Sequence, residues 1–71
     1  MAFREESSKL LDEEHALIDA ALVDTFHGAG YQVFGWTVND EEEMRRLVAL
    51  EVDGLCTNYP DVARRVVDSA A

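Results

Sequence analysis

The residues best able to take part in chemistry are two histidines, one cysteine and a run of acids. His15 and His27 lie in one helix-like stretch, where twelve residues of α-helix would place them about 18 Å apart, too far to share a metal ion. The acids at 40–43 could attract a hard cation weakly, but such residues are also typical of a solvated first helical turn. Cys56 is the only cysteine, which excludes an internal disulfide and a cysteine-based zinc cluster. We expect it to be a small buried side chain.

The overall charge excludes two classes of function. The 71 residues include fifteen Asp and Glu but only six Lys and Arg, which gives a net charge of −9. Phosphate backbones and anionic membrane surfaces should repel such a chain, so we expect no nucleic-acid partner. The longest apolar runs are only a few residues, so no membrane span is expected, and no stretch resembles a signal peptide. A cytoplasmic location is the resulting expectation.

The first half of the chain predicts a leader and then a helix. Residues 1–11 are polar and unpatterned apart from Phe3 and the Leu10–Leu11 pair, and we expect a partly disordered leader there. A helix is predicted from Asp12, which can cap it, to the glycines at 28 and 30, which tolerate the geometry of a helix end. The apolar stripe of this helix would consist of Leu17, Ile18, Ala21, Leu22 and Phe26.

The second half predicts two strands, each followed by a helix. Residues 31–38 (YQVFGWTV) are β-branched and aromatic with two apolar faces, as expected of a parallel strand buried on both sides. Asn39 would cap the next helix, with Glu42 as its capping-box partner. A short strand follows at 52–57, and Pro60 suits the first position of a third helix.

The predicted order is therefore α-β-α-β-α with two parallel strands joined by a right-handed crossover. Two strands leave unpaired edges, and parallel sheets are normally larger and covered on both faces. The order predicts an α/β fold that continues into a larger sheet or barrel.

Four short motifs carry a resemblance. They are WTVN at 36–39, MRRL at 44–47, VDGL at 52–55 and TNYP at 57–60. In this order and spacing they resemble the C-terminal part of the glycerophosphodiester phosphodiesterase family, and the resemblance covers residues 12–71. One position departs from it: the family has a glycine before Val-Asp-Gly, where this chain has Glu51.

The resemblance implies that residues 12–71 are a C-terminal fragment of a (β/α)₈ TIM barrel. The family hydrolyses phosphoric diesters in glycerophospholipid metabolism with a divalent metal ion, an H-R-G motif and acidic metal ligands that lie earlier in its domain. None of these motifs occurs here, so the resemblance transfers no catalytic residue and no metal ligand, and we expect the chain to be inactive alone.

Three residues would line the family's substrate pocket by resemblance: Trp36, Asn39 and Asn58. Each also has an ordinary structural interpretation. Trp36 could be a buried aromatic side chain, Asn39 a helix N-cap, and Asn58 a turn residue before x-Pro; the structural interpretation is favoured for both asparagines.

Other functions stay open at this point. Besides a fragment of the enzyme family, the chain could be a non-catalytic α/β module that self-associates or binds a partner to complete its sheet. It could also be a barrel segment excised to study folding.

Overall fold

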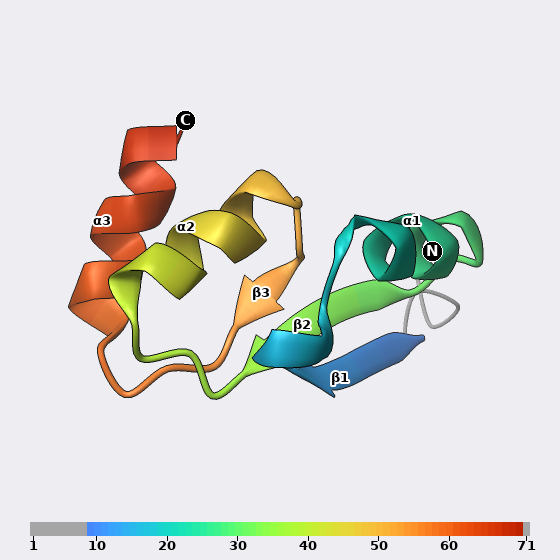
Figure 1. Cartoon of the computed structure of the whole chain (residues 1–71), viewed down its shortest axis with the longest axis horizontal. Helices are drawn as coiled ribbons and strands as arrows, with labels where there is room; N and C mark the ends of the chain where they lie inside the picture. Colours follow the sequence, from blue (N-terminus) through green and yellow to red (C-terminus); the bar gives the residue numbers. More distant parts are fainter. Residues whose placement is uncertain (1–8, 71) are drawn as a thin grey trace, which may run out of the picture.

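Three parallel strands, each followed by a helix, form the part of the chain that the structure describes, residues 9–70 (Figure 1). This computed structural model has the sheet order β1-β2-β3. The elements are β1 (Leu10–Glu14), a 3₁₀ turn (His15–Leu17), α1 (Ala20–Gly28), β2 (Gln32–Trp36), α2 (Glu41–Ala49), β3 (Gly54–Leu55) and α3 (Pro60–Ala70).

The predicted order with two strands was wrong, because the segment expected to begin the first helix is β1. It pairs with β2 in parallel, from Leu10 opposite Gln32 to Glu14 opposite Trp36. Aspartate and glutamate are poor strand formers, so nothing local in residues 12–14 indicates a strand. The neighbouring strand supplies the hydrogen bonds that hold this segment extended. Residues 1–8 of the expected leader lie outside the described residues, and Leu10 and Leu11 belong to β1.

The first helix consequently begins seven residues later than predicted. Asp19, not Asp12, is its N-cap, and its side chain accepts a hydrogen bond from the Leu22 N–H at 2.8 Å. Satisfying an otherwise unpaired N–H of the first turn stabilises the start of α1. The end was predicted correctly, since α1 finishes at Gly28 and Gly30 has a positive φ of 87°.

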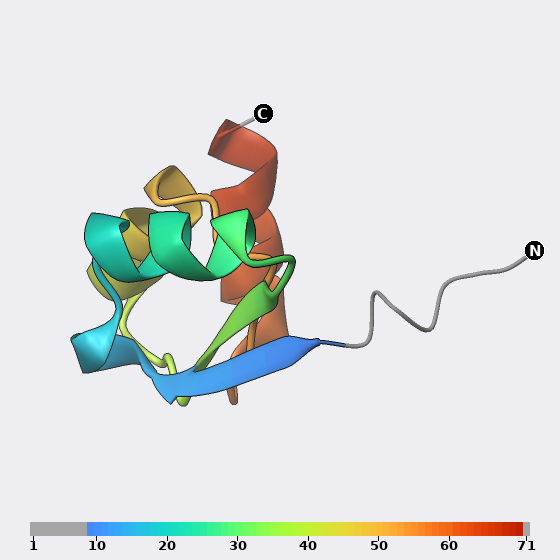
Figure 2. The same cartoon turned by 90° about the vertical axis from the view of Figure 1, so that its right-hand side faces the viewer.

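The three helices lie on one side of the sheet (Figures 1 and 2). On that side Val33 and Gly35 are buried, and a Cβ on Gly35 would lie 3.2 Å from both Ile18 and Leu47. The core consists of Ile18, Val23, Val33, Val38, Met44, Leu47 and Val66. No described element covers the other side, and there Trp36 is 44% exposed. The expectation that β2 is buried on both faces is therefore wrong for residues 9–70.

The second half of the chain follows the prediction closely, with one change of cap. Asp40, not Asn39, caps α2, and its side chain accepts from the Glu43 N–H at 3.1 Å. α3 begins at Pro60, as expected of proline at the first helical position. β3 is only two residues long and pairs with β2 in parallel, Phe34 opposite Gly54. Among residues 9–70, no helix is long and apolar enough to cross a membrane.

Candidate functional site

The carboxyl ends of the three strands lie along one edge of the sheet. Since ligands of α/β proteins bind outside this edge, it is the first place to look for a site. Trp36 ends β2 and is in register with Glu14, the last residue of β1. Neighbours in a parallel register project to the same face, and Glu14 and Trp36 are both exposed. The structural interpretation of Trp36 as a buried aromatic side chain is therefore wrong for residues 9–70.

The structure brings two of the three predicted site residues together. The Oδ1 atom of Asn39 accepts a hydrogen bond from the Asn58 N–H at 3.0 Å and a weaker one from the Thr57 hydroxyl at 3.4 Å. The Thr57 hydroxyl oxygen in turn accepts from the Tyr59 N–H at 3.0 Å. The favoured interpretation of Asn39 as a helix cap is wrong: its side chain connects the loop after β2 to the loop after β3. Among the described residues, Trp36 makes no hydrogen bond to either asparagine.

Sequence reasoning missed a cluster around Arg46. Its guanidinium donates to Glu43 through Nε at 2.9 Å and Nη2 at 2.6 Å, and to the Ile18 carbonyl oxygen at 2.7 Å. His15 Nδ1 also lies 2.9 Å from a Glu43 oxygen. The hydrogen bonds from Arg46 and then from His15 lower the pKa of Glu43 from its ordinary 4.5 to about 2. This Arg46 cluster fastens the segment after β1 onto α2.

The sequence offered only a partial signal for that cluster. The i,i+4 spacing of acids and arginines predicts ion pairs on α2, and the Glu41–Arg45 pair forms at 2.7 Å. The second predicted pair, Glu42–Arg46, does not form, because Arg46 turns toward Glu43 instead. Contacts between residues 28 positions apart, such as His15–Glu43, leave no local pattern.

The two histidines do not lie on one helix, contrary to the prediction. His15 is in the 3₁₀ turn, whereas His27 lies in the last turn of α1, with its Nε2 atom 2.8 Å from an Asp53 carboxylate oxygen. That oxygen also accepts from the Val33 N–H at 2.6 Å. Burial alone would raise the pKa of Asp53, but these two hydrogen bonds lower it overall. The contacts join α1, β2 and the loop before β3, so they serve the fold.

The described residues do not assemble a metal site, and Cys56 does not lie where the sequence predicts. Within residues 9–70, no three His, Cys, Asp or Glu side chains come close enough to hold a metal ion. Cys56 is exposed, which contradicts the expectation of a buried side chain. Its backbone continues the pairing of β3 with β2, since the Cys56 N–H donates to the Gly35 oxygen at 2.8 Å.

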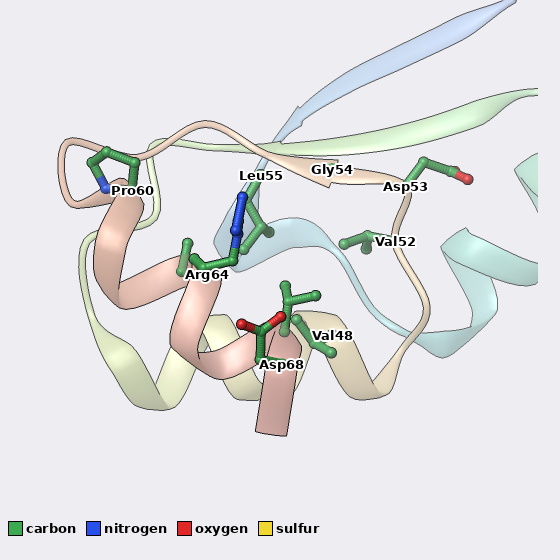
Figure 3. A pocket seen from close by; sticks show the side chains of 10 residues that line it. Val48, Val52, Asp53, Gly54, Leu55, Pro60, Arg64 and Asp68 are labelled. Carbon is green, nitrogen blue, oxygen red and sulfur yellow. The ribbon is translucent and has the colours of Figure 1, made fainter. Parts of the chain in front are cut away.

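A groove of about 570 Å³ lies along β3 (Figure 3). Val48, Leu55 and Val67 make it largely apolar, and Arg64 and Asp68 project into it from α3. None of Trp36, Asn39 and Asn58 contributes to it. β3 is an edge strand of the described sheet, so the groove is a surface on which a further strand or helix could pack.

Comparison with known proteins agrees with the resemblance. A model of the glycerophosphoryl diester phosphodiesterase family matches residues 5–62. A Mycobacterium tuberculosis protein named as a probable glycerophosphodiester phosphodiesterase is 41% identical over 51 residues, which are 72% of this chain and 19% of that protein. The chain spans about a fifth of the length of the curated relatives it matches.

Two solved structures share the fold. One is a Silicibacter pomeroyi DSS-3 protein that has been given the provisional name glycerophosphoryl diester phosphodiesterase. It is 28% identical to this chain, with a TM-score of 0.84, and the match covers 99% of this chain and 26% of that one. The other is an Oleispira antarctica phosphodiesterase in complex with the product sn-glycerol-3-phosphate. It is 27% identical with a TM-score of 0.77 over 83% of this chain and 24% of that one.

Proposed function

Because the chain belongs to the glycerophosphoryl diester phosphodiesterase family, we propose that it supplies one wall of a barrel that hydrolyses glycerophosphodiesters. The observation that carries the proposal is the uncovered face of the sheet, with Trp36 at its carboxyl edge. In a (β/α)₈ barrel, helices cover the outside and the active site lies at the carboxyl ends of the strands. The three helices of this chain likewise lie on one side only (Figure 2).

In this proposal the chain lines the substrate pocket and does not perform the chemistry. Trp36 presents an aromatic surface to the substrate, while Asn39 and Asn58 form the rim beside it. The divalent metal of the family would neutralise charge on the phosphate and activate the nucleophile. Residues 9–70 bring no three ligands for such an ion together, so the remainder of the barrel would have to complete the ligand set. The net charge of −9 likewise disfavours an anionic substrate unless a cation is bound nearby.

The first test uses the chain alone. We expect no hydrolysis of glycerophosphocholine by the 71-residue chain with excess Mg²⁺, Ca²⁺ or Mn²⁺. Metal-dependent hydrolysis that is lost on chelation would contradict the proposal, because it would require a metal site that this chain contains by itself.

The second test supplies the missing barrel. The aligned segment of the Oleispira antarctica phosphodiesterase is replaced by this chain, and phosphodiester hydrolysis by the chimera is measured. We expect activity, and we expect Trp36→Ala to lower it about tenfold or more, through lost substrate positioning. Asp24→Ala is the control, since Asp24 is exposed on α1, outside both the groove and the predicted site, and should leave activity unchanged. Equal activity of the Trp36 variant and the control would contradict the role of Trp36.

A second candidate function is a non-catalytic module that self-associates or binds a partner. Both outer strands of the described sheet have a free edge, and the groove along β3 is apolar. The two candidate functions predict different activities for the chimera. A chimera that is soluble and folded and keeps all metal ligands of the host enzyme, but is inactive, would favour the non-catalytic module.

We also propose a cytoplasmic location, which suits a lone, exposed cysteine in a reducing compartment. Recovery of the chain from the secreted or membrane fraction of its source cells would contradict it.

A further inference from the structure

The pairing of β2 with β3 extends past the ends of the two strands. After Leu55, the Cys56 N–H donates to the Gly35 oxygen, and the Val38 N–H donates to the Cys56 oxygen, both at 2.8 Å. Val38 is fully buried, so the backbone at this point is held in the core. The next hydrogen bond comes from a side chain: Asn39 Oδ1 accepts from the Asn58 N–H.

A side chain is needed there because the two backbones diverge. Asp40 is already the N-cap of α2, and Pro60 begins α3, so the chain turns away on both sides. Without Asn39, the Asn58 N–H would have to find water. Thr57 strengthens the arrangement, since its hydroxyl donates weakly to the same Oδ1 atom and accepts from the Tyr59 N–H.

From this geometry we propose that Asn39 is a positioning residue, which holds the loops after β2 and β3 together as one rim of the site. The inference deepens the proposed function and rests on it where activity is concerned. Asn39 acts through its amide oxygen on the backbone of Asn58, and so fixes the rim beside Trp36. It differs from the pocket-lining role that the resemblance implies, in which Asn39 would contact substrate.

The two roles are separable because both donors point at a single oxygen. Aspartate at position 39 still offers an oxygen to Asn58 N–H and to Thr57, so Asn39→Asp should keep the loops joined. Asn39→Ala removes the acceptor. Asn58→Ala is a matched control, since it deletes a side chain but leaves the N–H that makes the contact.

The first experiment measures amide hydrogen exchange on the 71-residue chain. In Asn39→Ala, the amide of residue 58 should exchange about fivefold faster relative to the Cys56 amide, the loss expected for one hydrogen bond. Asn39→Asp and Asn58→Ala should keep the original ratio. An unchanged ratio in Asn39→Ala, or an equal acceleration of both amides, would overturn the proposal.

The second experiment places the same variants in the chimera and measures turnover. We expect Asn39→Ala to lower kcat about tenfold through misplacement of the rim, and Asn39→Asp to restore it. Loss of activity in Asn39→Asp with the residue-58 amide still protected would overturn the positioning role, since it indicates direct contact with substrate. A chimera that is inactive even with Asn39 would count against the proposed function instead, and exchange would still decide whether Asn39 joins the loops.

Discussion

Glu51 occupies a backbone position that favours glycine. Among the described residues it alone, apart from glycine, has a positive φ, of 67°. It follows the C-cap of α2, where the Glu51 N–H donates to the Val48 oxygen at 3.0 Å and the Val52 N–H to the Leu47 oxygen at 3.3 Å. This pair of bonds is the Schellman motif, whose left-handed residue is usually glycine. The position was identified from the sequence, by its departure from the family's glycine.

Replacing Glu51 with glycine should therefore stabilise the chain. We expect the free energy of unfolding to rise by about 1 kcal/mol, because glycine adopts the left-handed conformation without steric cost. Urea denaturation followed by circular dichroism measures it. Glu51→Ala is the control, since it removes the charge and keeps the strain; a gain in Glu51→Ala equal to that in Glu51→Gly would assign the effect to charge.

Gly54 is required for a different reason: the ring of Phe34 on the neighbouring strand occupies the space that a side chain at position 54 would need. A Cβ at Gly54 would meet Phe34 Cε2 at a distance closer than such atoms approach in proteins. A glycine within a strand predicts that backbone or a helix approaches closely; the structure shows instead the ring of Phe34, which the register Phe34↔Gly54 places beside it. Gly54→Val should cost about 2 kcal/mol, in the range found for overpacking.

The comparison variant for Gly54→Val is Glu41→Ala, which loses only exposed ion pairs with Arg45 and Arg65 and should change the urea midpoint little. Phe34→Ala should also relieve the clash, so the two substitutions at 34 and 54 should be non-additive. Additive effects, or equal midpoints for the Gly54 and Glu41 variants, would place the ring of Phe34 elsewhere.

At the scale of elements, the Arg46 cluster determines how the segment after β1 packs on α2. Its carboxylate, Glu43, has a pKa of about 2 in the folded chain against an ordinary 4.5. A folded pKa below the unfolded value gives stability that is complete above pH 4.5 and is lost as the pH falls through the folded pKa. Acid should therefore loosen this contact between about pH 4.5 and 2.

Glu43→Gln should remove that dependence. We expect the variant to be less stable than the original chain by about 1 kcal/mol at neutral pH, since solvent screens part of the interaction. Its stability should then fall less steeply over the acid range. Thermal unfolding at a series of pH values measures both effects. Glu42→Gln is the matched control, because Glu42 is an exposed acid of the same turn. If stability depended on pH as weakly in Glu42→Gln as in Glu43→Gln, Glu43 would not be the source of the acid sensitivity.

At the scale of the whole molecule, two features oppose each other. Within residues 9–70, β1 and β3 have free edges and one face of the sheet is uncovered, which favours association with another chain. The net charge of −9 favours separation, and Asp12 and Glu14 lie in register on the uncovered face with Phe34 and Trp36. We therefore propose that the isolated chain self-associates and that salt strengthens the association.

Sedimentation at micromolar concentration tests this balance. We expect a dimer or larger species whose fraction rises between about 0.1 M and 1 M KCl, as the screening length falls from roughly 10 Å to 3 Å. Supplying the rest of the barrel, as in the chimera, should abolish the association because the edges are then paired. A folded monomer at every salt concentration would contradict the prediction.

Local patterns in the sequence were enough to predict the second half of the molecule and the family. β2, α2 and the start of α3 at Pro60 followed from local signals. Each of these depends on neighbours in the chain, through periodicity, caps and proline. The motifs that carried the family resemblance lie in the same half, and the family match at residues 5–62 confirms it.

The first half of the molecule and the contacts of the site depend on residues that are distant in the chain. Residues 12–14 form a strand because β2 lies beside them, although their own preferences oppose it. Asn39 bonds to Asn58 and not to the first turn of α2, because β2 and β3 end side by side, and Asp40 is free to cap the helix. These interactions join residues about twenty positions apart, and a pattern of neighbouring residues does not record them.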